Sequence, residues 1–241
     1  MITKNQLIIS CIFNGGNLLF LIYYIYDIIV RYTDLEHITR WSYYLNSIYT
    51  TINLFCDIME YISQEDQEDV DNQKNYNLMI DDGALEPKQK FEKLKEWNRN
   101  DFSVICNTLC YYVSIGFWSL FLLGNNLMSV STSIKSVFNC IYHHCIIQIV
   151  ILVDIFTFKR KIHFFSWFYL GIIYAIFIVY CLIIYVEKYF FGRNAYIFMN
   201  GSSRLFLLLC LFIGSLFLYP CYLLHIYLVK SRNTKTEKEI Y

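Results

Sequence analysis

Apolar residues fill six stretches of the chain, and each stretch is about as long as the 20 residues with which a helix crosses a lipid bilayer. Short polar segments separate most of them, and one long hydrophilic segment, 63–101, lies between the second and the third. The pattern predicts an all-α polytopic membrane protein, a bundle of six transmembrane helices. The predicted spans are 7–30, 37–62, 102–124, 136–158, 162–186 and 205–229.

An even number of spans predicts that both termini lie on the same side of the membrane. Lys and Arg number 14 on that side and 6 on the other, and the richer side normally faces the cytosol. We therefore expect transmembrane helices 1 and 2 within 1–62, a partly disordered cytosolic loop at 63–101, helices 3 to 6 within 102–230 and a cytosolic tail at 231–241. The acidic front of the loop is the part expected to be disordered. Residues 86–97 predict a short helix on the cytosolic lipid surface.

Composition supports an integral membrane protein of the endomembranes or plasma membrane, because 56% of the residues are hydrophobic and 19% are aromatic. The formal net charge is zero, so no nucleic-acid partner is indicated, and membrane lipid is the expected partner. The nine cysteines form no CxxC pair and lie almost entirely in apolar runs. They are interpreted as small apolar side chains, and no metal or cofactor is predicted.

The second span carries a polar stripe along one helix face, because polar residues recur there every three or four positions. This face is expected to look inward, towards a polar interior or a wet cavity. Hydrogen bonding between helices is the alternative interpretation. Asp57 and Glu60 lie near the predicted cytosolic end, where partial hydration is expected. The stripe comprises Thr39, Tyr43, Asn46, Thr50, Asn53, Asp57 and Glu60.

The fourth span holds two adjacent histidines, His143 and His144, among apolar neighbours. Polar and ionisable groups inside a membrane commonly mark functional sites. At 100° per residue, Asn139, His143 and Asp154 share one face, and His144 lies about 100° further round. Counted along the helices, both histidines lie in the outer half of the bilayer, about 12 Å from the depth of Thr39.

Residues 38–49, ITRWSYYLNSIY, resemble the Thr-x-Trp-Ser/Thr-x-x-Leu opening of the second span in the androgen-induced-gene-one family. That family comprises the androgen-induced and androgen-dependent TFPI-regulating membrane proteins, and related rolling-stone-like proteins share the opening. The fourth span, with Asn139, a histidine and an acidic residue ten positions after His144, is similar to the Asn/His helix of the family. Residues 167–180 and 192–198 look like the rolling-stone-like fifth span and the segment before the sixth.

The resemblance implies an intramembrane threonine-type hydrolase of lipid esters, such as fatty acid esters of hydroxy fatty acids. Thr39 would be the nucleophile and His144 the base, although the Asn-to-His spacing of four in the family selects His143 instead. Ser42 is a rival nucleophile because its depth is closer to that of the histidines. Asn46 and Asn139 are candidate substrate-binding donors to the oxyanion.

The chain also departs from the family, since the proline that usually follows the histidine is absent. Rolling-stone-like proteins are associated with cell fusion rather than with a defined reaction. The alternative function is therefore a non-enzymatic multi-pass membrane protein, acting as a scaffold, a fusion-linked adaptor or a small transporter.

Overall fold

The computed structural model describes residues 2–31, 38–73, 85–123, 141–158, 166–190, 192 and 204–239. Of the described residues 96% are helical and none is in a strand, which confirms the all-α class. Two π turns, η2 (Asn98–Phe102) and η4 (Tyr142–Ile146), precede α4 and α6 respectively. The helices are α1 (Lys4–Arg31), α2 (Ile38–Gln73), α3 (Leu85–Trp97), α4 (Ser103–Leu123), α6 (Ile147–Thr157), α7 (Trp167–Phe190), α8 (Arg204–Leu216) and α9 (Leu218–Glu239).

Three helical stretches in the described ranges are long and apolar enough to cross a membrane: Lys4–Tyr23, Trp167–Phe190 and Leu208–Arg232. A shorter apolar helix covers His144–Thr157. These stretches overlap the first, fifth, sixth and fourth predicted spans. These helices are compatible with an integral membrane protein.

Helix α1 begins with a capping box. The backbone N–H of Gln6 donates to Thr3 Oγ1 at 3.2 Å, and the backbone N–H of Thr3 donates to Gln6 Oε1 at 3.0 Å. The two bonds satisfy backbone donors that an uncapped helix would leave open. Gln6 Nε2 also donates to the carbonyl of Thr157 at 3.0 Å, so the start of α1 lies beside the end of α6.

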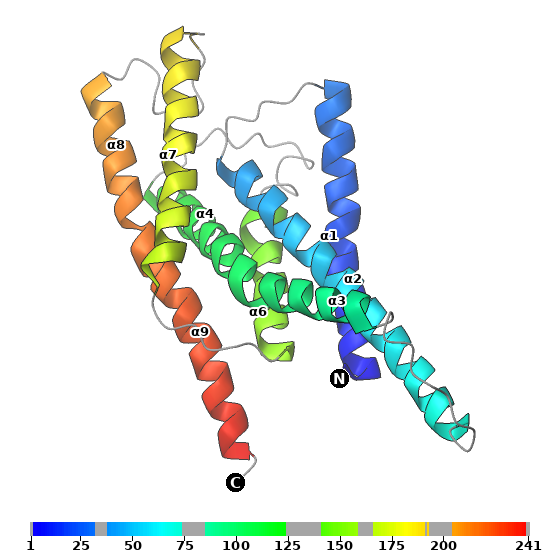
Figure 1. Ribbon diagram of the computed structural model, residues 1–241. Helices are drawn as coiled ribbons and strands as arrows, with labels where there is room; N and C mark the ends of the chain where they lie inside the picture. The colour runs from blue at the N-terminus through cyan, green and yellow to red at the C-terminus, as the bar shows by residue number, and fades with distance from the viewer. Residues whose placement is uncertain are drawn as a thin grey trace.

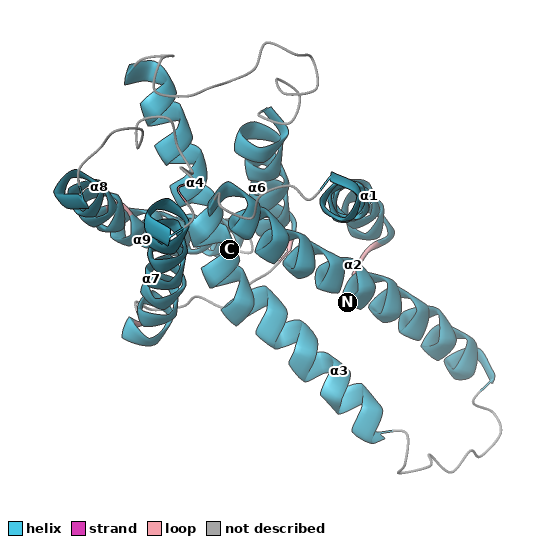
Figure 2. Cartoon of the chain, turned by 90° about the horizontal axis from the view of Figure 1, so that it is seen from above, coloured by secondary structure: helices cyan, strands magenta, loops and turns pink. Residues whose placement is uncertain are grey.

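Helix α2 continues to Gln73 instead of ending near residue 62, so it includes the acidic run at the front of the predicted loop. Residues 38–73 contain neither Gly nor Pro, and nothing in the local sequence stops the helix once it has formed. Helix α3 confirms the helix predicted at 86–97 and runs back beside α2 (Figure 2). The rings of Phe91 and Phe55 lie 6.2 Å apart, and Lys95 Nζ lies 2.5 Å from Glu60 Oε2.

The sixth predicted span is divided at Phe217 into α8 and α9. Pro220 explains the break, because it has no N–H to donate to the carbonyl of Leu216 and its ring collides with that carbonyl. The chain passes the break with a tight turn in which Phe217 N–H donates to Gly214 O at 3.1 Å.

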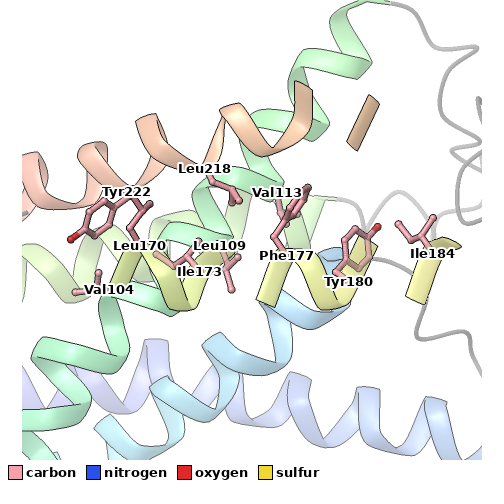
Figure 3. Packing of buried hydrophobic residues seen from close by; sticks show 10 residues of the cluster. All are labelled: Val104, Leu109, Val113, Leu170, Ile173, Phe177, Tyr180, Ile184, Leu218 and Tyr222. Atoms are coloured by element: carbon pink, nitrogen blue, oxygen red, sulfur yellow. The ribbon is translucent and has the colours of Figure 1, made fainter. Parts of the chain in front are cut away.

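Helix α4 lies at the centre of the molecule, between α2 and α6 on one side and α7 and α9 on the other (Figure 1). Its apolar face packs against α7 and α9, and the side chains of the three helices interleave in one row (Figure 3). Its other face carries polar residues and looks towards α2 and α6. The apolar row comprises Val104, Leu109, Val113, Leu170, Ile173, Phe177, Tyr180, Ile184, Leu218 and Tyr222.

Candidate functional site

A set of buried and partly buried polar side chains lies between α1, α2, α4 and α6. We call it the polar seam. Its members are held by hydrogen bonds and one ion pair between helices. The seam comprises Ser10, Asn14, Asn17, Asn46, Tyr49, Thr50, Asn53, Asp57, Asn98, Arg99, Asn107, Tyr142 and Asp154.

Two hydrogen bonds fix how α1 and α2 pack against each other. Ser10 Oγ donates to Asp57 Oδ2 at 2.5 Å, and Asn17 Nδ2 donates to Thr50 Oγ1 at 2.7 Å. The residues of each helix are seven positions apart, which is two turns, so both bonds lie on one face. The two helices therefore run antiparallel with their polar faces in register.

Asp57 is 0% exposed and forms an ion pair with Arg99, whose guanidinium also lies 4.6 Å from the centre of the Phe158 ring. The expected partial hydration of Asp57 is therefore wrong. A carboxylate removed from water needs a charged partner, and the chain provides it from the segment between α3 and α4. Glu60, one turn further along α2, pairs with Lys95 instead.

The segment containing the histidines joins the seam through two tyrosines. Tyr49 OH donates to Asp154 Oδ2, and Tyr142 OH donates to Asn17 Oδ1 at 2.5 Å. Asn98 of η2 adds a further link, because its Nδ2 donates to the backbone carbonyl of Tyr49 at 3.1 Å. Four separate segments of the chain thus meet at these groups.

The predicted catalytic residues are only partly within the described structure. The side chains of Thr39 and His143, and all of Asn139, lie outside it. Ser42 is 3% exposed, and its backbone carbonyl accepts from Cys110 Sγ at 3.6 Å. His144 is 8% exposed and belongs to the π turn η4.

His144 packs against α4. Its ring stacks on Phe117 with centroids 3.8 Å apart and planes 9° from parallel, and its backbone carbonyl accepts from Trp118 Nε1 at 3.2 Å. A π turn has more residues per turn than an α-helix, so the 100° spacing that grouped Asn139, His143 and Asp154 on one face does not hold across this segment. Asp154 contacts Tyr49 of α2.

Helix α2 also packs against α4, in antiparallel register. Cys106 Sγ donates to the carbonyl of Leu45 at 3.4 Å, one turn before the contact between Cys110 and Ser42. Continued by three residues, this register puts the backbone of Thr39 level with residue 113. Phe117, on which His144 stacks, is four residues further along α4, a rise of about 6 Å. Counted along the axis of α4, the backbones of Thr39 and His144 are therefore about 6 Å apart, which is half of the depth difference predicted from the sequence.

Asn46 is engaged within the bundle at both ends of its amide. Its Oδ1 accepts from Asn17 Nδ2 at 3.4 Å, and its Nδ2 donates to Asn107 Oδ1 at 3.5 Å. The geometry gives this residue a clear part in holding α1, α2 and α4 together. Interhelical hydrogen bonding, the alternative interpretation of the stripe, therefore describes Asn46 well.

Sequence reasoning missed several members of the seam. Ser10, Asn14 and Asn17 recur every three to four residues in the first span, the same signal that revealed the stripe of the second span. Arg99 was counted with the charges of the hydrophilic loop, and no local pattern distinguishes it from its neighbours. Its role depends on the π turn η2, which brings it to Asp57.

The chain was compared with protein-family models, curated proteins and solved structures, and none of them matches it.

Proposed function

We propose that the chain is an intramembrane hydrolase of lipid esters, with six spans and cytosolic termini, in which Thr39 is the nucleophile and His144 the base. One observation carries the proposal. Helix α2 and the η4 turn pack against the same helix, α4, in registers that bring the backbone levels of Thr39 and His144 to within about 6 Å. The resemblance of 38–49 to a family of threonine hydrolases also selects Thr39, and that of the fourth span selects His144 or His143.

The reaction would proceed through an acyl-enzyme. A threonine hydroxyl is a weak nucleophile at neutral pH and needs a base that takes its proton as it attacks the ester carbonyl. The imidazole of His144 would accept that proton and return it to the leaving alcohol. Water would then attack the acyl-threonine with the same base, releasing the fatty acid. His143 and Ser42 remain the alternative base and nucleophile.

The surroundings of His144 suit a lipid substrate. Its ring lies flat against Phe117, and Trp118 is beside it on α4. Aromatic side chains of this kind provide an apolar wall for an acyl chain, and limited access of water strengthens the electrostatic interactions of a reacting ester. Asn139 is the expected donor to the oxyanion, because both ends of the Asn46 amide are engaged elsewhere.

The test is covalent labelling of the purified full-length protein by a lipid-like fluorophosphonate probe, together with hydrolysis of a long-chain ester. We expect labelling and turnover to be lost in Thr39→Ala, and turnover to be lost in the double variant His143→Ala/His144→Ala. Removal of one member of a nucleophile–base pair typically lowers kcat by several orders of magnitude.

Thr51→Ala is the matched control, because Thr51 lies on the same helix and its hydroxyl donates only within the helix, to Ser47 O at 2.7 Å. It should retain labelling and turnover. Loss of labelling in Ser42→Ala but not in Thr39→Ala would move the nucleophile by one turn. Unchanged turnover in both the threonine and the double histidine variants would exclude this mechanism.

The alternative is a non-enzymatic multi-pass protein, and the bonding of the polar seam favours it. Asn17, Asn46, Thr50 and Asp57 are all bonded to side chains of other helices, as expected for residues that hold a bundle together. A scaffold would show no covalent labelling. A small transporter would show solute or proton flux in proteoliposomes, and Asp57→Asn should abolish that flux.

A further inference from the structure

We infer that the polar seam contains a binding site for one internal water molecule, held between Asn14 of α1, Asn53 of α2 and Asn98 of η2. All three side chains are at most 2% exposed. Within the described part of the chain, three of their amide atoms have no hydrogen-bond partner: Asn14 Oδ1, Asn53 Nδ2 and Asn98 Oδ1. Buried polar atoms are rarely left in this condition, because the lost hydration is not replaced.

Asn14 and Asn53 face each other. Asn14 lies between Ser10 and Asn17 on α1, and Asn53 lies between Asp57 and Thr50 on α2. The flanking residues are joined across the two helices by the bonds from Ser10 to Asp57 and from Asn17 to Thr50. Because the spacing on each helix is three to four residues, all of these side chains are on the facing surfaces.

The orientation of each amide is fixed by its other bonds. Ser10 donates its single proton to Asp57, so its oxygen accepts from Asn14 at 2.9 Å, and the Asn14 nitrogen must lie there. Asn98 Nδ2 donates to two carbonyl oxygens, Asn53 Oδ1 at 2.9 Å and Tyr49 O at 3.1 Å. These contacts require a nitrogen at this side of the Asn98 amide and an oxygen at the facing side of the Asn53 amide. Exchanging the oxygen and nitrogen of any one of these amides would place two acceptors or two donors within hydrogen-bond distance of each other.

The atoms without a partner identify the group that binds between the three amides. Two acceptors and one donor remain, so the bound group must donate two hydrogen bonds and accept one. Water does so and typically makes about three bonds in such a site. A metal cation such as Na⁺ does not fit. It would be repelled by the N–H groups of the Asn53 amide, and the negative charge of Asp57 is already neutralised by Arg99. The site is separate from Thr39 and His144, since Asn53 is 14 residues from Thr39 along α2, about 21 Å.

The direct test is a structure of the full-length protein at a resolution that reveals ordered water. We expect one spherical density within hydrogen-bond distance of Asn14 Oδ1, Asn53 Nδ2 and Asn98 Oδ1. Direct contact between the amides, with no density between them, would overturn the inference. Anomalous scattering at this point from crystals grown with Rb⁺ would also overturn it, because the occupant would then be a cation.

Asn14→Gln provides the second measurement. The side chain is one methylene longer, so its amide can reach Asn53 and displace the water; the density should be lost and the thermal unfolding midpoint should change little. Asn17→Gln is the matched control on the same face, because both ends of the Asn17 amide are already bonded. Crowding there should lower the midpoint by roughly 3 to 6 °C. An equal fall in the midpoint of both variants would contradict a displaceable water.

Discussion

At the scale of single residues, the seam depends on a few buried charged and polar groups. Each of them stabilises the fold only when its partner is present. Asp57 and Arg99 come from segments 42 residues apart in the sequence, and Tyr49 and Asp154 from segments 105 residues apart. A buried group that loses its partner keeps the full cost of its desolvation. These pairs are therefore the positions at which one substitution should do most damage.

Arg99→Met should lower the free energy of unfolding by about 3–5 kcal/mol, because it leaves the Asp57 carboxylate buried and uncompensated. Thermal unfolding in detergent measures the effect. The double variant Arg99→Met/Asp57→Leu should recover most of the loss. Lys95→Met is the control, since the Lys95–Glu60 pair is 12–15% exposed and should contribute less. Equal losses in Arg99→Met and Lys95→Met would contradict the importance of the buried pair.

Tyr49→Phe removes only a hydroxyl, yet it should lower the free energy of unfolding by about 1–3 kcal/mol, because Asp154 loses its donor inside the bundle. Chemical or thermal unfolding of the two proteins in the same detergent gives the difference. Tyr227→Phe, at a side chain that is 66% exposed, should leave stability unchanged.

At the scale of elements, α3 continues through η2 into α4 and packs sideways against α2. Phe91 contacts Phe55, and Lys95 contacts Glu60, whereas Leu94 and Trp97 on another face are substantially exposed. This arrangement makes α2 and α3 an antiparallel helical hairpin that projects from the rest of the bundle (Figure 2). Such an element can open locally without unfolding the core.

Phe91→Ala should accelerate backbone hydrogen exchange in α3 while leaving exchange in α4 and α7 unchanged, because it removes the aromatic contact that attaches α3 to α2. Hydrogen–deuterium exchange followed by mass spectrometry resolves the two regions. Leu94→Ala is the control on the exposed face and should have little effect. Faster exchange throughout the molecule would show that α3 is part of the core.

The helices themselves were largely predictable, because long apolar runs and the break at Pro220 are local signals. The polar face of α4, with Ser103, Asn107, Cys110 and Ser114, was also readable from its spacing. The hydrogen-bond and ion-pair partners on other helices were not predictable. No pattern in the neighbouring sequence pairs Arg99 with Asp57. The two π turns change the direction of the side chains, and neither turn contains a Gly or Pro that would predict it. Pairings between distant segments depend on how helices pack, which periodicity within one helix does not encode.

At the scale of the whole molecule, the helices divide into an apolar half around α4, α7 and α9 and a polar half around α1, α2, α4 and α6. Helix α4 belongs to both, because its two faces differ in character. The start of α1 and the end of α9 lie towards the same end of the molecule (Figure 1).

Epitope tags fused to the two ends of the chain should both be accessible to antibody when only the plasma membrane of expressing cells is permeabilised. The reason is that positive charge is concentrated in the segments assigned to the cytosol. Staining of both tags only after all membranes are opened would reverse the orientation. Staining of one tag alone would contradict an even number of crossings.

The alignment of Ser10, Asn14 and Asn17 along one face of α1 has a consequence for biogenesis. These groups leave the ribosome before α2 does, and hydrocarbon offers no substitute for the bonds that Ser10 and Asn17 later make with Asp57 and Thr50. Helix α2 carries both of these partners. The two helices are therefore expected to leave the translocon as a pair, with the first retained until the second arrives.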